Sequence, residues 1–575
     1  MQARKTAVND RNEEQYRKGP GDWQWNRLLS LLLTMTIMFA AGCGGVKPEI
    51  TSSPPADDKP VTLQKGGRLV YGSMQEPDTL NPLFSDLVAT AEVSSLIFSG
   101  LVKRSANGEW LPDLVREVPT TANGGVSPDG LTVTYRLRSG VPWHDGAPFN
   151  AEDVRFTWQL IMNRQAHIAS RDGYDKISRI DTPDPYTVVV RFSEVYPGYL
   201  SLFPSILPRH ILGVAPDLNK APFNRNPVGT GPFRFKEWRV AEAVILDANP
   251  SYFQGKPLLD GITYKVTPDV AILMNQLKSG DVDIVGNINF AQLEQVRGMN
   301  GIKVTVTPNM LWEHLDFNLD LPLFQDVKVR RAISLGIDRA AITSGLLKNI
   351  ATPVAGDQAL ISWAFNPILR VPSRDVEAAR ALLLEAGWKP GADGIFVKDR
   401  QKLAFTLMTN ANNKIRGLVA QNIAQQLKEI GIAVEVRPVD ATAFFDDFLK
   451  NRRFEMAMYA WVLGNDPDDY SLWNSRRIPG RYSPDGQNYP GWRNAEVDKL
   501  TAQALTATNM EARKQMYYRI QDILAEECPA IPLYFHGNID AAKKRVVHFQ
   551  PNPTAAGNLW NAWQWGLAVE ENKNR

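Results

Sequence analysis

Cysteine and histidine are scarce in this chain of 575 residues, which contains two cysteines, Cys43 and Cys528, and six histidines. Two cysteines are too few for the disulfide framework of a small secreted scaffold. The histidines are scattered along the chain, and no two of them have the i, i+4 spacing of a zinc-binding helix. The usage of these residues therefore gives no sign of a metal centre.

The motifs of common catalytic sites are also missing. The chain has no phosphate-binding GxxxxGK[ST] loop, GxGxxG turn, HExxH helix, GxSxG nucleophile elbow or CxxC pair. The nearest enzyme-like feature is Trp143-His144-Asp145-Gly146, which is more typical of a tight turn with a partly buried histidine. The sequence thus indicates a protein that is not an enzyme and needs no cofactor.

Neither sign of charge dominates, since the chain contains 64 Lys and Arg residues and 62 Asp and Glu residues. Residues 1–42 hold six basic and four acidic residues, so the rest of the chain has 58 of each. Nucleic-acid binding normally needs a basic face. The balance of charge therefore argues against a nucleic-acid partner.

The one long apolar run lies near the N-terminus, where residues 28–42 are uncharged and follow Arg27. These fifteen residues are fewer than the ~20 of a membrane-spanning helix but are typical of a signal peptide. The run ends in small residues before Cys43, which resembles the lipobox of bacterial lipoproteins. We therefore expect residues 1–42 to be a removed signal peptide and Cys43 to carry the lipid, a palmitate anchor. The alternative is an uncleaved short anchor followed by a chance cysteine.

Residues 43–64 are rich in proline, serine and aspartate and show no apolar periodicity, so they are expected to form a flexible tether. If Cys43 is lipidated, Cys528 has no partner for an intramolecular disulfide. Cys528 ends an apolar helical pattern and is expected to be a small buried residue.

Strand-like and helix-like patterns alternate after the tether, which favours α/β layers. The predicted elements are strands over 131–138, 282–285 and 434–436 and helices over 151–162, 269–279 and 415–430. The apolar stripe of the last helix comprises Ile415, Leu418, Val419, Ile423, Leu427 and Ile430. Proline and glycine are spread evenly, so we expect lobes joined by crossing strands rather than by long linkers.

Nine short stretches resemble, in the same order, the motifs of one protein family. The most distinctive is VPWHDGAPFNAEDV at residues 141–154. The other eight are residues 76–82, 206–212, 229–235, 277–284, 326–339, 386–389, 522–534 and 559–563. Together they resemble the family 5 extracellular solute-binding proteins, the oligopeptide, dipeptide and nickel receptors of ABC importers.

This resemblance implies an α/β fold of two lobes that close like a clamp, the type II periplasmic-binding-protein-like fold with an extra α/β subdomain inserted in the first lobe. We expect the first lobe at 65–106 and 221–312 with a return segment at 537–575, the inserted subdomain at 107–220, and the second lobe at 313–536. In this family the lobes close around the ligand, and the closed form is what the importer recognises.

The implied function is capture of an oligopeptide or dipeptide and its delivery to the permease subunits of an ABC-type importer. The resemblance and the N-terminal pattern together imply a monomer held by lipid at the extracytoplasmic face of the cell membrane, at the cell surface or in the periplasm.

A peptide ligand needs a carboxylate for its α-amino group, because a desolvated ammonium group must be paired. Oligopeptide and dipeptide receptors place this aspartate three residues after a tryptophan. Trp461 matches that tryptophan, but the third residue after it is Gly464. The nearest carboxylates are Asp466, Asp468 and Asp469, of which we expect Asp466 to bind the amine, with Asp468 as the second choice. The alternative is an Asp-Pro turn whose acids are solvated.

Further ligand contacts are implied by the resemblance. Val88 falls in a first-lobe loop that touches the ligand. Asn309 and His314 lie where the chain first crosses into the second lobe, and His536 lies where it crosses back. These histidines could hydrogen-bond a peptide backbone or be packed hinge residues. Trp461 and Trp473, on the two sides of the acidic turn, are expected to be walls for ligand side chains.

Three alternatives remain open. One is a nickel, haem or opine receptor of the same fold. A nickel-chelate site usually uses histidine or arginine in the cleft, for which His314 and His536 are available. A surface sensor would pass ligand occupancy to a signalling partner instead of a permease. An exported hydrolase is disfavoured because the nucleophile and metal motifs are missing.

Overall fold

The structure is a computed structural model that describes residues 62–569. The predicted signal peptide, Cys43 and most of the predicted tether lie outside the described residues. No helix within residues 62–569 is both long and apolar enough to cross a bilayer.

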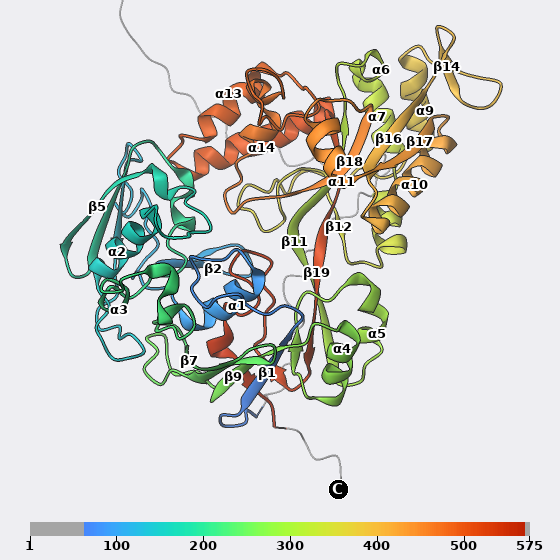
Figure 1. The fold of residues 1–575 in the computed structure, drawn as a ribbon. Helices are drawn as coiled ribbons and strands as arrows, with labels where there is room; N and C mark the ends of the chain where they lie inside the picture. Colours follow the sequence, from blue (N-terminus) through green and yellow to red (C-terminus); the bar gives the residue numbers. More distant parts are fainter. Residues whose placement is uncertain (1–61, 570–575) are drawn as a thin grey trace, which may run out of the picture. The chain divides into compact units, whose positions relative to one another are not determined.

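One mixed sheet of eleven strands runs through both lobes (Figure 1). Its hydrogen-bonded order is β17 (Ala433–Val439), β16 (Ala404–Asn410), β18 (Met456–Val462), β11 (Ile302–Phe317), β19 (Ala530–Lys543), β10 (Ile284–Val285), β1 (Arg68–Ser73), β9 (Gly261–Val266), β8 (Ala243–Ala248) and β7 (Phe233–Arg239), and β12 (Thr352–Pro353) pairs with β19 beside this path. The first three strands belong to the second lobe, and the last five belong to the first lobe. The two-lobed α/β fold is the predicted one.

The lobes are joined by the two long antiparallel strands β11 and β19, as predicted (Figure 1). Their pairing extends from Ile302–Lys543 to Asp316–Ala530, with register shifts between Pro308 and Trp312 and between Glu313 and His314. The predicted domain boundaries after residues 312 and 536 fall inside these strands. A crossing made of paired strands lets the lobes move about a hinge that keeps its hydrogen bonds.

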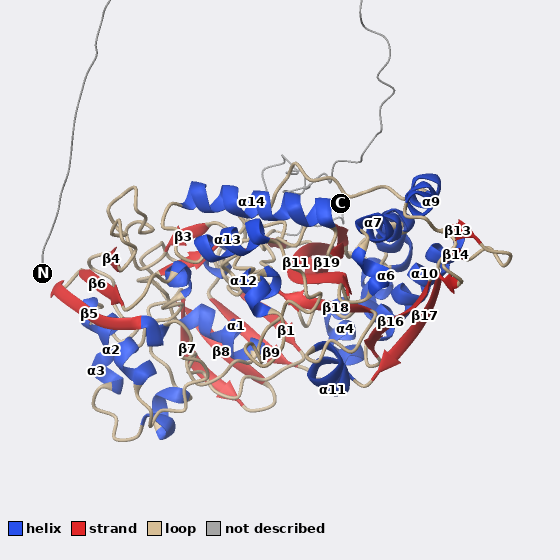
Figure 2. Ribbon diagram, turned by 90° about the horizontal axis from the view of Figure 1, so that it is seen from above, coloured by secondary structure: helices blue, strands red, loops and turns tan. Residues whose placement is uncertain are grey.

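Helices cover the sheet of the second lobe. These helices are α7 (Val327–Gly336), α9 (Val376–Glu385), α10 (Lys414–Glu429), α13 (Ala495–Ala504) and α14 (Met510–Glu527). The long α10 packs against β16 and β17, and α13 packs along α14 (Figure 2). Buried side chains such as Ile423 and Leu427 form the core beneath α10. This layer gives the second lobe a core of its own.

The first lobe contains the helices α1 (Val88–Ile97), α4 (Val270–Ser279) and α5 (Leu293–Arg297). A separate sheet of three strands, β4 (Thr132–Arg136), β6 (Thr187–Phe192) and β5 (Ile177–Asp184), lies with α2 (Ala151–Met162) inside the segment predicted as an insertion. One continuous apolar cluster includes side chains of both sheets, such as Val190 and Ile262. The three-stranded sheet therefore shares the core of the first lobe.

Short elements complete the description. They are β2 (Val102–Arg104), β3 (Trp110–Pro112), α3 (Arg209–Leu212), α6 (Pro322–Gln325), α8 (Arg339–Ala341), β13 (Lys389–Pro390), β14 (Phe396–Lys398), β15 (Gln401–Lys402), α11 (Ala441–Ala443), α12 (Tyr470–Trp473), β20 (Val546–Val547) and β21 (Gly566–Leu567).

Several local predictions are confirmed. Asn150 caps α2, and Asp153 accepts a hydrogen bond from the Asn150 amide, which completes the predicted capping box. α4 ends at Gly280, whose φ of 95° lies in the left-handed region that favours glycine. Cys528 is buried, as expected.

Two details of the prediction are wrong. The strand predicted over 282–285 pairs only over Ile284–Val285. Leu418 is 57% exposed, which contradicts its predicted place in the apolar stripe of α10. At 3.6 residues per turn, Leu418 points away from the buried face that Val419, Ile423 and Leu427 share.

A buried carboxylate ties α1 to the sheet of the first lobe. Glu92 accepts hydrogen bonds from the hydroxyls of Tyr71 on β1 (2.9 Å) and Tyr264 on β9 (2.8 Å). Burial raises the pKa of Glu92 to about 7, and the nearby carboxylate of Asp540, whose own pKa burial raises to about 6, adds to this effect. Glu92 is therefore held as a neutral acid below neutral pH.

The Glu92→Gln variant is expected to lose part of the pH dependence of stability. An acid whose pKa is higher in the folded state contributes stability that is present at low pH and is lost as pH rises from about 4.5 to about 7. Relative to the variant, the wild type should lose on the order of 3 kcal/mol of unfolding free energy between about pH 5 and about pH 8. Urea unfolding at the two pH values measures this difference, and parallel pH profiles of the two proteins would contradict the assignment.

Candidate functional site

The crossing strands are held together by side chains where their backbone ladder is interrupted. Asn309 lies in this interruption on β11, and its Nδ2 donates to Oδ1 of Asn538 on β19 (2.9 Å). The Oδ1 of Asn309 accepts from the Leu311 amide (2.9 Å). Asn309 thus lies half-buried at the point where the two lobes meet.

A buried ion cluster lies next to this point. Glu313 of β11 is fully buried and accepts hydrogen bonds from Nε and Nη2 of Arg416, at the start of α10. Nε2 of His536, on β19, lies 2.9 Å from Oε2 of Glu313. Burial alone would raise the pKa of Glu313, but the His536 hydrogen bond and the Arg416 charge outweigh it and lower the pKa. Glu313 is therefore an ionised group that joins both crossing strands to α10.

Aromatic side chains form a stack on β11 and β18. The ring of His314 lies parallel to that of Trp312, with 4.0 Å between the centroids, and meets the ring of Tyr459 edge-on. Trp461 follows on β18 and stacks on Tyr489. His314 is 1% exposed, whereas Trp461 is half-buried. Of the two predicted site residues in this stack, His314 and Trp461, only Trp461 is accessible to solvent.

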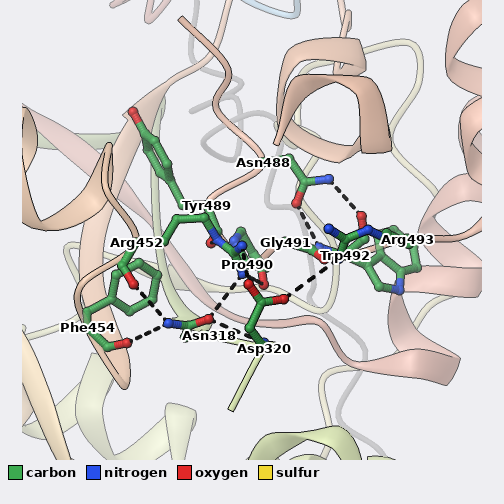
Figure 3. Close-up of polar contacts among 10 residues, drawn as sticks. All are labelled: Asn318, Asp320, Arg452, Phe454, Asn488, Tyr489, Pro490, Gly491, Trp492 and Arg493. Atoms are coloured by element: carbon green, nitrogen blue, oxygen red, sulfur yellow. Dashed lines mark hydrogen bonds and ion pairs between the residues drawn. The ribbon is translucent and has the colours of Figure 1, made fainter. Parts of the chain in front are cut away.

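The loop that carries Tyr489 is fixed by Arg452 (Figure 3). Nε of Arg452 donates to the Tyr489 carbonyl (2.9 Å), and its Nη2 donates to the Pro490 carbonyl (3.0 Å) and to Oδ1 of Asn318 (3.1 Å). Asp320 forms an ion pair with the same guanidinium. This network positions Tyr489 against Trp461.

The acidic turn after β18 is only partly free to bind a cation. Asp466 forms a two-pronged ion pair with the buried guanidinium of Arg513 on α14 (2.7 Å for Nη1 to Oδ2). Asp468 is exposed. Gly464 is exposed as well, and it stands at the position where the resemblance predicts a carboxylate. The favoured amine partner, Asp466, therefore already has a cationic partner within the chain, whereas Asp468 has none among the described residues.

A small pocket opens beside this turn. Its lining includes Asp357, Gln358, Asp468, Asp469 and Leu472. Asp357 and Asp469 are each 2% exposed. Trp473 is buried behind them, and its Nε1 donates to Oδ2 of Asp357 (2.6 Å). Trp473 thus orients a carboxylate of the pocket and presents almost no surface of its own.

The first lobe reaches the acidic turn through Arg104. Nη1 of Arg104, on β2, donates to the backbone oxygen (3.0 Å) and Oδ1 (3.2 Å) of Asn465. The lobes also approach closely at Gly108, where a Cβ would lie 2.2 Å from the Ile361 carbonyl oxygen. Val88, at the start of α1, is 58% exposed. The two lobes are therefore in contact beside the pocket.

The structure brings some predicted residues together and leaves others apart. Asp466 and Asp468 lie in the acidic turn between Trp461 on β18 and Trp473 on α12, and Asn309, His314 and His536 lie on the crossing strands. The prediction that Val88 lies in a loop is wrong, because Val88 is the first residue of α1 in the first lobe. Sequence reasoning missed Arg104, Asp357 and Arg513, which come from distant segments and carry no local motif.

Within residues 62–569, no group of three or more His, Cys, Asp and Glu side chains is arranged to hold a metal ion. His314 and His536 have different polar neighbours, Asp316 and Glu313 respectively. The two histidines of the crossing strands therefore do not share an acidic neighbour.

Comparison with known proteins agrees with this architecture. The family model described as bacterial extracellular solute-binding proteins, family 5 (middle part), matches residues 111–481. The chain belongs to this family. Family members bind solutes outside the cytoplasm, and the crossing strands, the pocket and the contact between the lobes are features of this solute-binding protein.

Two relatives of this solute-binding protein illustrate the range of the family. The oligopeptide-binding protein AppA of Bacillus subtilis (strain 168) is 31% identical over 552 residues, which are 94% of this chain and 98% of AppA. The structure of that AppA with a nonapeptide covers 88% of this chain and 100% of its own, with a TM-score of 0.60. The structure of NikZ from Campylobacter jejuni with Ni(L-His) is 27% identical, with a TM-score of 0.62, and covers 87% of this chain and 99% of its own.

Proposed function

We propose that this protein is the peptide receptor of an ABC-type importer. The observation that carries the proposal is the similarity over nearly the whole of both chains to an oligopeptide-binding protein. The hinge of paired strands and the contact between Arg104 and Asn465 support capture by lobe closure, because they allow a closed state that a ligand can stabilise. In this proposal the closed receptor hands the peptide to membrane permease subunits and catalyses no reaction.

The proposed binding surface combines both lobes. Val88 contributes from the first lobe, and Asn309 and His536 contribute from the crossing strands. Trp461 and Asp468 contribute from the second lobe, and Asp466, His314 and Trp473 support them from less exposed positions. The proposed domain boundaries are those expected from the sequence, with the lobes divided within β11 and β19.

Native mass spectrometry of the purified protein, followed by denaturation and identification of the released molecules, tests this function. We expect a set of short peptides, since a clamp that buries its ligand releases it slowly. Release of a nickel chelate, haem or another small solute in place of peptides would contradict the proposal. The same experiment after incubation with peptides exposes any hydrolysis, because cleaved products would appear.

We further propose that Cys43 carries the lipid that holds the receptor at the extracytoplasmic face of the membrane as a monomer. Cys43→Ser is expected to move the protein from the membrane fraction to the soluble fraction and to abolish palmitate labelling, since a lipid chain supplies about 0.8 kcal/mol of membrane affinity for each buried CH₂. The matched control is Cys528→Ser, which removes the only other cysteine and should leave fractionation unchanged. Membrane retention of the Cys43→Ser protein would contradict the anchor.

A further inference from the structure

A larger cavity, of about 70 Å³, lies within the second lobe. All of its lining residues fall in the segment from Trp312 to Pro532, on β11, α7, α8, α12, α14, β19 and the loop after β12. Leu524 and Ala525 of α14 and Ala530 of β19 give the cavity apolar walls. The second lobe and the crossing strands thus enclose it by themselves, and a ligand there does not need the lobes to close.

One end of the cavity is formed by a buried arginine without an anionic partner. Arg339, at the start of α8, is 2% exposed. Its guanidinium donates to the Pro532 carbonyl (2.7 Å) and to the carbonyl (3.1 Å) and hydroxyl (2.8 Å) of Ser334. These contacts do not use all N–H groups of a guanidinium. No carboxylate among residues 62–569 forms an ion pair with Arg339, so its charge is available to a ligand of the cavity.

Other buried arginines of the second lobe have their charge or their donors engaged. Arg416 pairs with Glu313, and Arg513 pairs with Asp466. Arg330 has no carboxylate but donates to backbone carbonyls of α6 and of the end of α14 with every nitrogen of its guanidinium. Arg339 differs from both kinds, because it keeps unused donors and faces a cavity.

A second guanidinium gives the cavity a net positive charge. Arg370 also lines it and is exposed, which places this arginine where the cavity meets solvent. Burial lowers the pKa of Arg339 to about 10 and raises the pKa of Asp357, the acid of the lining, to about 6. At about pH 7.5 the two arginines are therefore charged against one carboxylate. A single bound monoanion balances this lining.

The other end of the cavity holds a donor and an acceptor without partners. Trp312 and Asp357 both lie against Trp473, which meets the Trp312 ring edge-on (6.2 Å between centroids) and donates to Oδ2 of Asp357 (2.6 Å). Among the described residues, neither Nε1 of Trp312 nor Oδ1 of Asp357 has a hydrogen-bond partner. No ion pair joins Asp357 to Arg339 within the same residues, so the two ends are distinct. A hydroxyl group can accept from the indole and donate to the carboxylate at once.

Size and charge together restrict the ligand. The cavity has room for roughly two to five water-sized groups. A carboxylate matches the planar fork of a guanidinium and supplies the balancing charge. A hydroxyl on the neighbouring carbon would meet Trp312 and Asp357. An ammonium group in its place cannot accept from the indole, and it makes the ligand a zwitterion that leaves the positive charge unbalanced.

We propose that the second lobe binds a small hydroxycarboxylate, of the size of glycolate, in this cavity. Its carboxylate lies at Arg339 and Arg370, and its hydroxyl lies between Trp312 and Asp357. The site is separate from the proposed peptide-binding surface, and the inference stands independently of the peptide-receptor function.

Equilibrium dialysis of the full chain against isotopically labelled glycolate at about pH 7.5 tests the site. Unlabelled acetate lacks the hydroxyl, glycine has an ammonium group in its place, and ethylene glycol lacks the carboxylate. Each should need at least about tenfold more than unlabelled glycolate to displace the label, because each leaves a buried polar group or charge unpaired. Absence of glycolate binding would overturn the proposal, as would displacement by acetate or glycine at the concentration at which glycolate displaces.

Two variants place the ligand in the cavity. Trp312→Phe keeps an aromatic ring but removes the indole N–H, so it should weaken glycolate binding at least about fivefold and leave acetate binding unchanged. Arg370→Gln removes the exposed charge and should weaken the binding of both anions about threefold to tenfold. Arg481→Gln is the matched control, since Arg481 is an exposed arginine of the same lobe outside the lining. Thermal unfolding verifies that the variants are folded, and unchanged glycolate binding in either Trp312→Phe or Arg370→Gln would overturn the assignment.

Discussion

Replacing Arg416 with alanine is expected to destabilise the folded protein by about 3–5 kcal/mol, because it leaves a buried charge without a partner. Glu313 is fully buried, and Arg416 supplies two of its hydrogen bonds. His536 alone then faces the carboxylate (2.9 Å). Urea unfolding followed by tryptophan fluorescence measures the loss.

The control for this prediction is Arg519→Ala, which breaks the exposed ion pair with Glu496. An exposed pair is screened by water, so this variant should unfold almost as the wild type does. Replacing Glu313 and Arg416 together by leucine should recover part of the stability lost in Arg416→Ala, since no unpaired charge remains. Equal stability of Arg416→Ala and wild type would show that Glu313 is not held as an ion by Arg416.

Replacing Arg104 with alanine is expected to weaken peptide binding about tenfold to a hundredfold. The buried guanidinium joins the first lobe to Asn465 of the second by two hydrogen bonds, and Nε and Nη2 also donate to the Gly108 carbonyl (3.1 and 2.8 Å). Hydrogen bonds from a charged group contribute about 1.5–3 kcal/mol, and those to Asn465 are available only when the lobes touch. Loss of these hydrogen bonds shifts the population toward the open state. Part of the free energy of ligand binding is then used to close the lobes, so the apparent affinity falls.

Calorimetry and small-angle X-ray scattering together check this prediction. The Arg104→Ala protein should have a larger radius of gyration without ligand and a weaker affinity for peptide. Arg136→Ala is the matched control, because Arg136 is an exposed arginine of the same lobe that pairs with Glu117 (2.9 Å). Unchanged scattering and affinity in Arg104→Ala would show that this contact does not stabilise closure.

The position of Asp466 shows where motif reasoning reached its limit. The resemblance pointed to the turn after β18, where Asp466 and Asp468 line one pocket, and the binding role of that turn stays a prediction. The ion-pair partner of Asp466 could not be predicted, because Arg513 is 47 residues away in the sequence. The residues around Arg513 indicate an amphipathic helix and nothing about a partner. Asp357 was equally hard to identify from the sequence. It lies 112 positions before Asp469 and belongs to no recognisable local motif.

The sequence by itself determined the family, the two-lobed α/β fold, the crossing by strands and the capped helices α2 and α4. These features depend on periodicity, on caps and on ordered motifs, all of which are local in the chain. Only the tertiary structure decided which charges are paired, namely Arg416 with Glu313 and Arg513 with Asp466, and which buried carboxylates, namely Asp357 and Asp469, have no ion-pair partner among residues 62–569. The physical reason is that the energy of a charge depends on its burial and on its neighbours in space, and neither is encoded in the spacing of residues.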